Sequence, residues 1–460
     1  MRKKKRYFVL LLGLMMLHVA AFSQTTKWRD IYTVKKKDTI FGIANAYGLT
    51  LPELMEANPE MKKEGYMLKK GTTLFIPFAK DGAQQANAHA AGNAGGKNAP
   101  AKSASSQKQA NTVNVGVMLP LHDVDGDGRR MVEYYRGILM ACEKLKQQGI
   151  STNIHAWNVP IDADIRTTLV KDGANTCDII FGPLYSKQVS PLADFCKTYG
   201  IKMVIPFSIM GDDVDKNKEV FQVYQSPESL NDASIKAFLS RFKNVHPIFV
   251  DCNDSTSRKG VFTFGLRKEL EKRNINYSVT NVNSSLEYFA KAFVPSKQNV
   301  VILNTGRSPQ LTQVLNKLDE FSAKYPGAVI SLFGYTEWLM YAKYNLDRFY
   351  KYDTYIPSTF YYNVNSAKTI DLERRYNLWF HQPMQVAMPR FAITGYDHAM
   401  YFIQGINKAG KEFNGGKAQV NYQPVQTPLH FVKTAHGGYR NQVLQLIHYT
   451  FNRQIEAVTY

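Results

Sequence analysis

The sequence predicts an α/β protein made of two units of unequal size joined by a linker. The segment 79–112 consists largely of Ala, Gly, Asn, Gln, Ser and Lys, and it separates residues 24–78 from residues 113–460. Such a segment cannot bury enough surface to offset its ordering entropy, so we expect a flexible coil with an r.m.s. span of roughly 30 Å. The short unit follows the order strand, helix, helix, strand. The long unit alternates apolar strands with amphipathic helices in two blocks, which is typical of two α/β lobes with parallel sheets.

Residues 1–23 are predicted to be a signal peptide. MRKKKR supplies a basic start, YFVLLLGLMMLHVAAF an apolar core, and AFS the small residues that a signal peptidase reads. No Cys follows the apolar stretch, so we expect no lipid anchor on a processed N-terminal cysteine. An uncleaved anchor is the alternative, although the apolar stretch is short for a membrane span. The expectation is export to the periplasm or cell envelope, with no membrane contact after cleavage.

The chain is strongly basic. Removing the five positive charges of residues 1–23 lowers the formal net charge from +19 to +14. Such a surface attracts acidic polymers, which include nucleic acid, anionic lipid headgroups and the carboxylate-bearing peptides of a cell wall. Export makes nucleic acid the least favoured of the three, and the sequence contains no RNA-binding or zinc-finger pattern. We therefore expect no nucleic-acid partner.

The small unit is predicted to form two strands around two short helices. Segments 31–34 and 73–76 read as the strands. Asp38 or Thr39 can cap the first helix and Thr50 the second. The run DTI-x-x-IA-x-x-YGLT-x-x-x-L-x-x-x-NP, closed by G-x-x-L-x-IP, resembles a LysM domain over the whole unit. The sequence departs from the usual pattern at Lys37, where the family has Gly, and in the long MKKEGYMLKK segment.

This resemblance implies binding of N-acetylglucosamine-containing glycans such as peptidoglycan. The family's groove lies between the first strand–helix loop and the loop before the last strand. Backbone amides there would bond the N-acetyl group while apolar side chains cover the sugar ring. Ile40 and Phe41 also read as core residues, and Asp38 as a helix cap only. The expected groove residues are Lys37, Asp38, Thr39, Ile40, Phe41, Asn58, Pro59, Met61 and Leu68.

The large unit begins with the apolar strand VNVGVMLPL and a helix with one apolar face. The strands NIHAWNV, CDIIFGPLY and KMVIPFS follow, and a second block contains HPIFVDC, YSVTNV, NVVILNTG and AVISLFG. The motifs YYRGILMACEKL, IIFGPLYSKQVSPLADFCKTYG, VFQVYQSPES and TGYDHAMYFIQGI, in this order, make the unit similar to type I periplasmic binding proteins of the leucine/isoleucine/valine-binding family. The resemblance implies chain crossings between lobes near residues 226–229, 357–360 and 428–432, with ligand between the lobes.

In the amino-acid binders of that family, hydroxyl groups after the third and fourth strands hold the ligand carboxylate, and an acid from the other lobe holds its ammonium group. Ser186 and Ser208 match the hydroxyls, and Glu337 is the candidate acid. Ser186 reads equally well as a helix cap. Arg129 and Arg130 lie where an anionic ligand would meet the first loop. The candidate cleft residues are Tyr185, Ser186, Phe207, Ser208, Glu337, Arg129 and Arg130.

The first loop of the large unit, HDVDGDGRR, stands where amino-acid binders have a short Ser/Thr-Gly turn, which argues against a standard amino-acid ligand. Asp123, Asp125 and Asp127 resemble half of a calcium loop. Such a loop needs a glutamate at its twelfth position, where this chain has Tyr134, and it follows a helix rather than a strand. We expect an acidic lip on the cleft, and no metal or cofactor.

Four cysteines permit three disulfide pairings that the sequence does not distinguish. Two of them fall on apolar helix faces, which makes buried free thiols the alternative. They are Cys142, Cys177, Cys196 and Cys252.

The sequence contains no HExxH, GxSxG, Walker or GxGxxG motif, and we expect no catalysis. Two non-catalytic hypotheses remain. In one, the LysM-like unit holds peptidoglycan while the large unit captures a small solute or muropeptide. In the other, the large unit is a wall-tethered adaptor for a protein partner among envelope enzymes, as in some periplasmic-binding-like regulators of peptidoglycan synthases. A cryptic wall hydrolase is the third and least favoured possibility.

Overall fold

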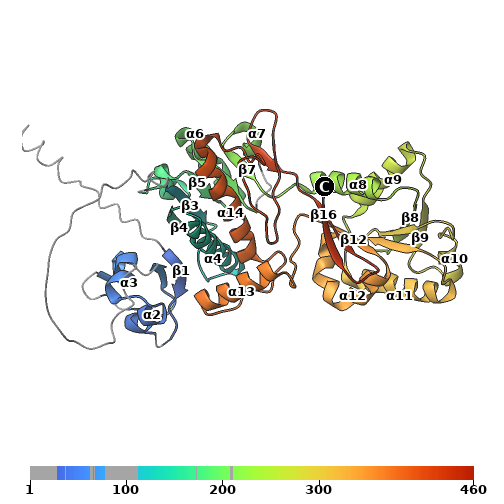
Figure 1. The fold of residues 1–460 in the computed structure, drawn as a ribbon, viewed down its shortest axis with the longest axis horizontal. Coiled ribbons are helices and arrows are strands. Elements are labelled where there is room, and N and C mark those ends of the chain that lie inside the picture. The colour runs from blue at the N-terminus through green and yellow to red at the C-terminus, as the bar shows by residue number, and fades with distance from the viewer. Residues whose placement is uncertain are drawn as a thin grey trace, which may run out of the picture.

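The computed structural model describes most of the chain as three bodies that follow one another along its length: a small N-terminal domain, lobe 1 and lobe 2 (Figure 1). The predicted signal peptide, Lys37, Ser208 and nearly all of the predicted linker lie outside the described residues. The described residues are 28–36, 38–62, 66, 68–77, 112–171, 173–207 and 211–460.

The small domain has the predicted β-α-α-β order, and its first strand begins three residues earlier than expected. The Thr39 side chain accepts a hydrogen bond from the Gly42 amide and so caps the first helix. Thr50 and Glu53 form a capping box on the second helix. The two strands pair antiparallel. The elements are β1 (Trp28–Thr33), α2 (Ile40–Ala46), α3 (Leu51–Ala57), η1 (Pro59–Lys62) and β2 (Thr73–Pro77).

Lobe 1 contains a seven-stranded sheet with the order β13-β14-β7-β6-β5-β3-β4. The pairs are parallel except for the antiparallel β13–β14 pair. Apolar side chains of β3 alternate between two cores, with Val117 packed under α4 and α14 and Met118 packed under α6. The strands are β3 (Val113–Leu119), β4 (Thr152–Asn158), β5 (Ile179–Phe181), β6 (Lys202–Ile205), β7 (Val220–Gln222), β13 (Phe431–Lys433) and β14 (Tyr439–Asn441).

Helices α4 and α14 pack closely on this sheet because glycines face each other's backbone. A Cβ on Gly137 would lie 1.9 Å from the Ala392 carbonyl oxygen, and one on Gly395 would lie 2.0 Å from the Tyr134 oxygen. The helices of lobe 1 are α4 (Gly126–Gln147), α5 (Arg166–Leu169), η2 (Ala174–Thr176), η3 (Ser186–Gln188), α6 (Val189–Tyr199), α7 (Asp213–Lys216), α13 (Ala367–Phe380), α14 (Phe391–Ala409) and η5 (Gly410–Glu412).

Lobe 2 has a second seven-stranded sheet, with the order β16-β15-β12-β11-β10-β8-β9. Its strands pair parallel except for the antiparallel β12–β15 and β15–β16 pairs. The strands are β8 (His246–Asp251), β9 (Ser278–Asn281), β10 (Asn299–Leu303), β11 (Ile330–Phe333), β12 (Thr354–Ser358), β15 (Gln445–Tyr449) and β16 (Ile455–Thr459). The helices are α8 (Pro227–Arg241), α9 (Gly260–Lys272), α10 (Leu286–Ala290), α11 (Ser308–Lys324), η4 (Thr336–Tyr341) and α12 (Ala342–Lys351).

The chain crosses between the lobes at residues 223–226, 359–366 and 442–444. The first two crossings lie close to the expected positions. The third was expected at 428–432, which is wrong, because β13 and β14 first add an antiparallel pair to the sheet of lobe 1. The α/β fold with two lobes and parallel-rich sheets is confirmed.

The four cysteines are buried and free. The acidic first loop of the large unit provides the N-cap of α4. The Asp125 carboxylate accepts a hydrogen bond of 2.7 Å from the Gly128 amide. Tyr134, at the twelfth position counted from Asp123, is fully buried in the core of lobe 1. The loop therefore starts a helix.

Candidate functional site

The predicted glycan groove of the small domain is open to solvent at three of its residues. Thr39, Phe41 and Pro59 are exposed, and the Phe41 ring has an exposed fraction of 71%. Asp38 holds the loop in shape, because its carboxylate accepts hydrogen bonds of 2.7 Å from the Tyr32 hydroxyl and from the Lys35 amide. The hydrogen bond from Tyr32 lowers the pKa of Asp38, which favours its charged form.

Other residues of the predicted groove are structural. Asn58 is fully buried, and its amide donates to the Leu54 and Phe75 carbonyls while its oxygen accepts from the Phe75 amide. It therefore joins the end of α3 to β2 and presents no polar atom to a sugar. Met61 is also buried, in the core of the small domain, against which half-buried Ile40 and Leu68 pack.

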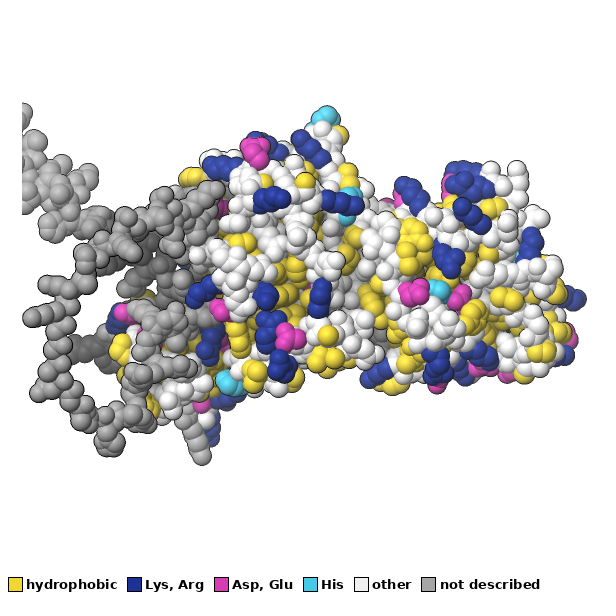
Figure 2. Space-filling view, in the orientation of Figure 1, with side chains coloured by type: hydrophobic (Ala, Val, Ile, Leu, Met, Phe, Trp, Pro, Cys, Tyr) yellow, Lys and Arg dark blue, Asp and Glu magenta, His cyan; other side chains and the backbone are white. Residues whose placement is uncertain are grey.

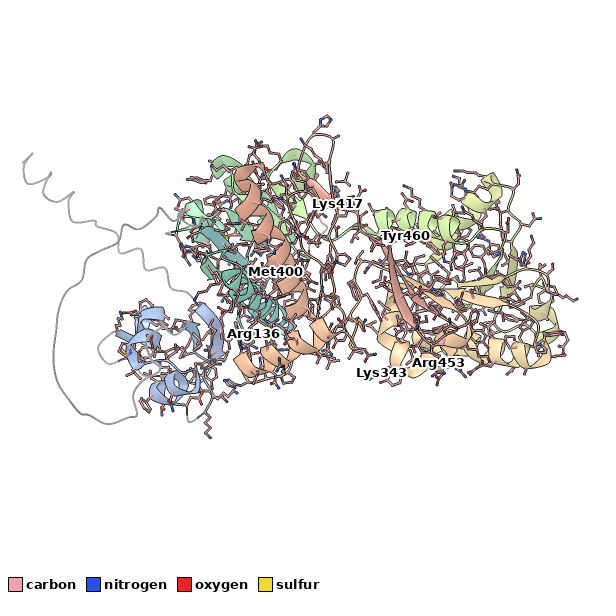
Figure 3. All side chains as sticks on the ribbon, in the orientation of Figure 1. Arg136, Lys343, Met400, Lys417, Arg453 and Tyr460 are labelled. Atoms are coloured by element: carbon pink, nitrogen blue, oxygen red, sulfur yellow. The ribbon has the colours of Figure 1, made fainter. Side chains whose placement is uncertain are left out.

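The small domain packs on lobe 1 through β1. Asp30 is fully buried, and Arg136 of α4 donates to it from Nε at 2.7 Å and from Nη2 at 3.4 Å. The second carboxylate oxygen also accepts from the Tyr47 hydroxyl at 3.2 Å. On the other side, Arg136 donates to the Tyr376 hydroxyl and lies 5.1 Å from the Phe380 ring centroid. Figure 3 shows Arg136 between the small domain and lobe 1.

Apolar contacts extend this interface. Ile31 of β1 and half-buried Phe75 of β2 pack into the core of lobe 1. The Tyr47 ring meets His381 edge to face, with centroids 6.2 Å apart. The small domain is thus docked on lobe 1 by a buried ion pair surrounded by apolar and aromatic side chains.

Beside this interface lies a pocket with a volume of about 900 Å³. Both the small domain and lobe 1 line it, and its walls combine cations, aromatic rings and side-chain amides. The lining residues used below are Tyr32, Lys35, Lys36, Lys70, Asp123, Arg129, Tyr376 and Gln385.

Glu133 of α4 is nearly fully buried close to this interface. Its Oε1 accepts from the Gln385 amide at 2.9 Å, and its Oε2 has no hydrogen-bond partner within the described residues. Burial raises the pKa of Glu133 to about 7, against the opposing effects of the Gln385 amide, Arg136 and Arg390. Glu133 therefore changes its protonation state near neutral pH.

The predicted cleft residues Tyr185, Ser186 and Phe207 belong to lobe 1. Ser186 is exposed at the first position of η3, after Tyr185, whose hydroxyl donates to Asp127 at 3.4 Å. Phe207 packs edge to face on Tyr134 and on Tyr224. Ser208 lies outside the described residues.

The charged candidates are engaged elsewhere. Glu337 of lobe 2 forms a salt bridge of 2.6 Å with Lys259 of the same lobe. Arg130 pairs with Asp127 at 3.3 Å, and Arg129 lines the pocket at the small domain. Each of these three candidate side chains therefore has a charged partner or a position within its own lobe or at the LysM domain.

Sequence reasoning missed Asp30, Arg136 and Tyr376, which form the centre of the docked interface. The available signal was a charged residue next to apolar ones: Asp30 directly precedes the predicted strand 31–34, and Arg136 lies in YYRGIL of the predicted helix. A charge at such a position requires a partner when it is buried. The sequence does not reveal which partner.

Across the described ranges, no helix combines the length and the apolar character needed to cross a bilayer. Within the same residues, no group of three or more His, Cys, Asp or Glu side chains is arranged to hold a metal ion.

Comparison with known proteins supports both resemblances. Residues 32–77 match the family model of the LysM domain. No curated protein matches the chain. A putative branched-chain amino acid ABC transporter from Rhodospirillum rubrum has a TM-score of 0.51 at 14% identity, over 76% of this chain and 100% of that chain. LpoA of Haemophilus influenzae has a TM-score of 0.50 at 13% identity, over 77% of this chain and 60% of that chain. Residues 32–77 are therefore a LysM domain, and the two lobes that follow have the type I periplasmic-binding-protein fold.

Proposed function

We propose that this protein is a non-catalytic component of the cell envelope that binds peptidoglycan through its LysM domain. The observation that carries the proposal is the exposed groove: Phe41, Thr39 and Pro59 face solvent although the domain is docked on lobe 1. An exposed aromatic ring beside backbone amides suits the apolar face and N-acetyl group of a sugar. The basic surface of both lobes, on which Lys and Arg side chains are spread widely (Figure 2), would attract an acidic polymer.

Co-sedimentation of the intact protein with purified peptidoglycan tests this proposal. We expect the wild-type protein to pellet with the wall material and Phe41→Ala to pellet at least several-fold less. Phe264→Ala is the matched control, because Phe264 is also an exposed phenylalanine (67%), on α9 of lobe 2. Wild-type protein that stays in the supernatant would refute wall binding, and equal pelleting of Phe41→Ala would remove Phe41 from the site.

For the two lobes we propose an adaptor role toward a protein partner in the envelope. The salt bridge between Glu337 and Lys259 supports this role, because it occupies the acid that would otherwise hold a ligand's ammonium group. Arg129, another candidate cleft residue, lines the pocket beside the LysM domain, and this supports the adaptor role as well.

Capture of a small solute is the second candidate, and one observation favours it. Phe207, one of the predicted cleft residues, packs edge to face on Tyr134 and Tyr224 and so forms an aromatic cluster. Thermal melts of the intact protein with amino acids, short peptides and muropeptides distinguish the two roles. A saturable rise in melting temperature with an amino acid would support solute capture, since a ligand that binds only the folded state stabilises it. No shift would favour the adaptor.

A further inference from the structure

The pocket between the LysM domain and lobe 1 is lined by more cations than anions. Exposed Lys35, Lys36 and Lys70 come from the LysM domain, and exposed Arg129 comes from lobe 1. Asp123 is an exposed acid on the same wall. The buried Asp30 does not offset these cations, because Arg136 already pairs with it. The pocket thus offers a positive field to a ligand that carries several negative charges.

Its walls also suit a peptide. The half-buried Tyr32 ring supplies apolar surface. Exposed Gln385, whose Nε2 donates to the Arg129 carbonyl at 2.9 Å, supplies a side-chain amide. A volume of about 900 Å³ lies in the upper part of the range of ligand pockets. The buried ion pair between Asp30 and Arg136 fixes the two walls relative to each other, so the pocket is formed before a ligand arrives.

One loop links the pocket to the predicted glycan groove. Tyr32 and Lys35 line the pocket, and both donate hydrogen bonds of 2.7 Å to Asp38, which belongs to the groove. A glycan held in the groove would therefore place whatever hangs from it close to the pocket's cations.

We propose that this pocket is a second site, which binds the carboxylate-bearing stem peptide of peptidoglycan while the LysM groove holds the glycan. The inference rests on the proposed function and deepens it, because it assigns recognition of the peptide to a surface built jointly by two domains. The lysines and Arg129 pair with the peptide carboxylates, and the Tyr32 ring and the Gln385 side-chain amide contact its backbone.

Calorimetric titration of the intact protein tests the proposal with three probes: peptide-free glycan chains, the same chains carrying stem peptides, and the free stem peptide. We expect wild-type protein to bind peptide-bearing chains about tenfold more tightly than peptide-free chains, the gain that a few exposed ion pairs supply together. The triple variant Lys35→Gln, Lys70→Gln, Arg129→Gln should lose this preference and keep the wild-type affinity for peptide-free chains.

A control variant with the same loss of charge, Lys197→Gln, Lys243→Gln, Lys297→Gln, should keep the preference, because these exposed lysines lie on the lobes and do not line the pocket. All substituted residues are exposed, and melting curves will show that each variant is folded. Equal preference in wild-type and triple variant, or no preference in the wild type, would overturn the peptide site. Binding of the free peptide and of peptide-bearing chains, without binding of peptide-free chains, would support the pocket and refute glycan binding by the LysM domain.

Discussion

Arg136 of α4 and Asp30 of β1 form a salt bridge of 2.7 Å whose side chains are 11% and 0% exposed, and this pair joins the LysM domain to lobe 1. Removing two charges from water is costly, and the attraction between them repays that cost only with good geometry and further hydrogen bonds. Here the Tyr47 and Tyr376 hydroxyls supply those bonds. The pair therefore contributes more to fixing the orientation of the LysM domain on lobe 1 than to the free energy of unfolding.

Substituting Arg136 with Met should release the LysM domain from lobe 1. The substitution leaves Asp30 buried without a cation, a penalty of about 3–5 kcal/mol that the domain avoids by undocking into water. Small-angle scattering should show a larger radius of gyration, and hydrogen exchange should increase along β1. Arg453→Met is the control, because Arg453 pairs with Asp347 at the surface, where an ion pair contributes about 1 kcal/mol or less. An unchanged radius of gyration for Arg136→Met would show that apolar contacts hold the domain by themselves.

Glu133 should make the protein less stable as the pH rises toward neutrality. Its pKa in the folded state, about 7, is above its ordinary value, so its contribution to stability is complete below about pH 4.5 and is lost as the pH rises through 7. Glu133→Gln should flatten this part of the stability profile by on the order of 2 kcal/mol. Urea unfolding at pH 5 and pH 7.5 measures the difference, with the exposed Glu320→Gln as control. If the free energy of unfolding changed equally with pH in the wild type and in Glu133→Gln, the raised pKa of Glu133 would be contradicted.

Asp397 of α14 should be essential for the order of segment 422–427. Its buried carboxylate accepts from the Tyr422 hydroxyl and from three backbone amides, those of Val425, Gln426 and Thr427. Asp397→Ala leaves these donors unpaired, and each buried unpaired donor costs about 1–3 kcal/mol. We expect a loss of at least about 3 kcal/mol in the free energy of unfolding. Asp371→Ala, at a half-exposed position on α13, should cost less than about 1 kcal/mol.

Alanine at Gly395 should force α4 and α14 apart. The new Cβ would lie 2.0 Å from a backbone oxygen of Tyr134, which cannot move without displacing the helix. Overpacking of this kind costs about 1–3 kcal/mol, and the melting temperature should fall accordingly. Gly327→Ala is the matched control, because no atom lies within 4 Å of its Cβ position. Equal melting temperatures for the two variants would mean that the helices tolerate a wider separation.

Local patterns predicted much of the fold. The β-α-α-β order of the LysM domain and the alternation of strands and helices in both lobes depend on periodicities that a short window of sequence contains. The third crossing between lobes was misplaced because β13 and β14 are only three residues long each and carry little periodic signal.

The site was less predictable, because its geometry depends on contacts between distant segments. Asp30 and Arg136 are 106 residues apart and meet only when two domains dock. Asn58 matched a groove position, but its side chain is fully used within the domain, and this follows from its contact with β2. Glu337 is the candidate acid in the sequence, but it forms a salt bridge with Lys259, which lies 78 residues earlier in lobe 2.

The docking of the LysM domain ties its predicted glycan groove to lobe 1. Because the domain is docked on lobe 1, a glycan bound in its groove would hold lobe 1 as well. Lobe 2 lies at the far end of the molecule (Figure 1). A molecule held through this groove would therefore present lobe 2 farthest from its anchoring point, joined to lobe 1 by the three chain crossings.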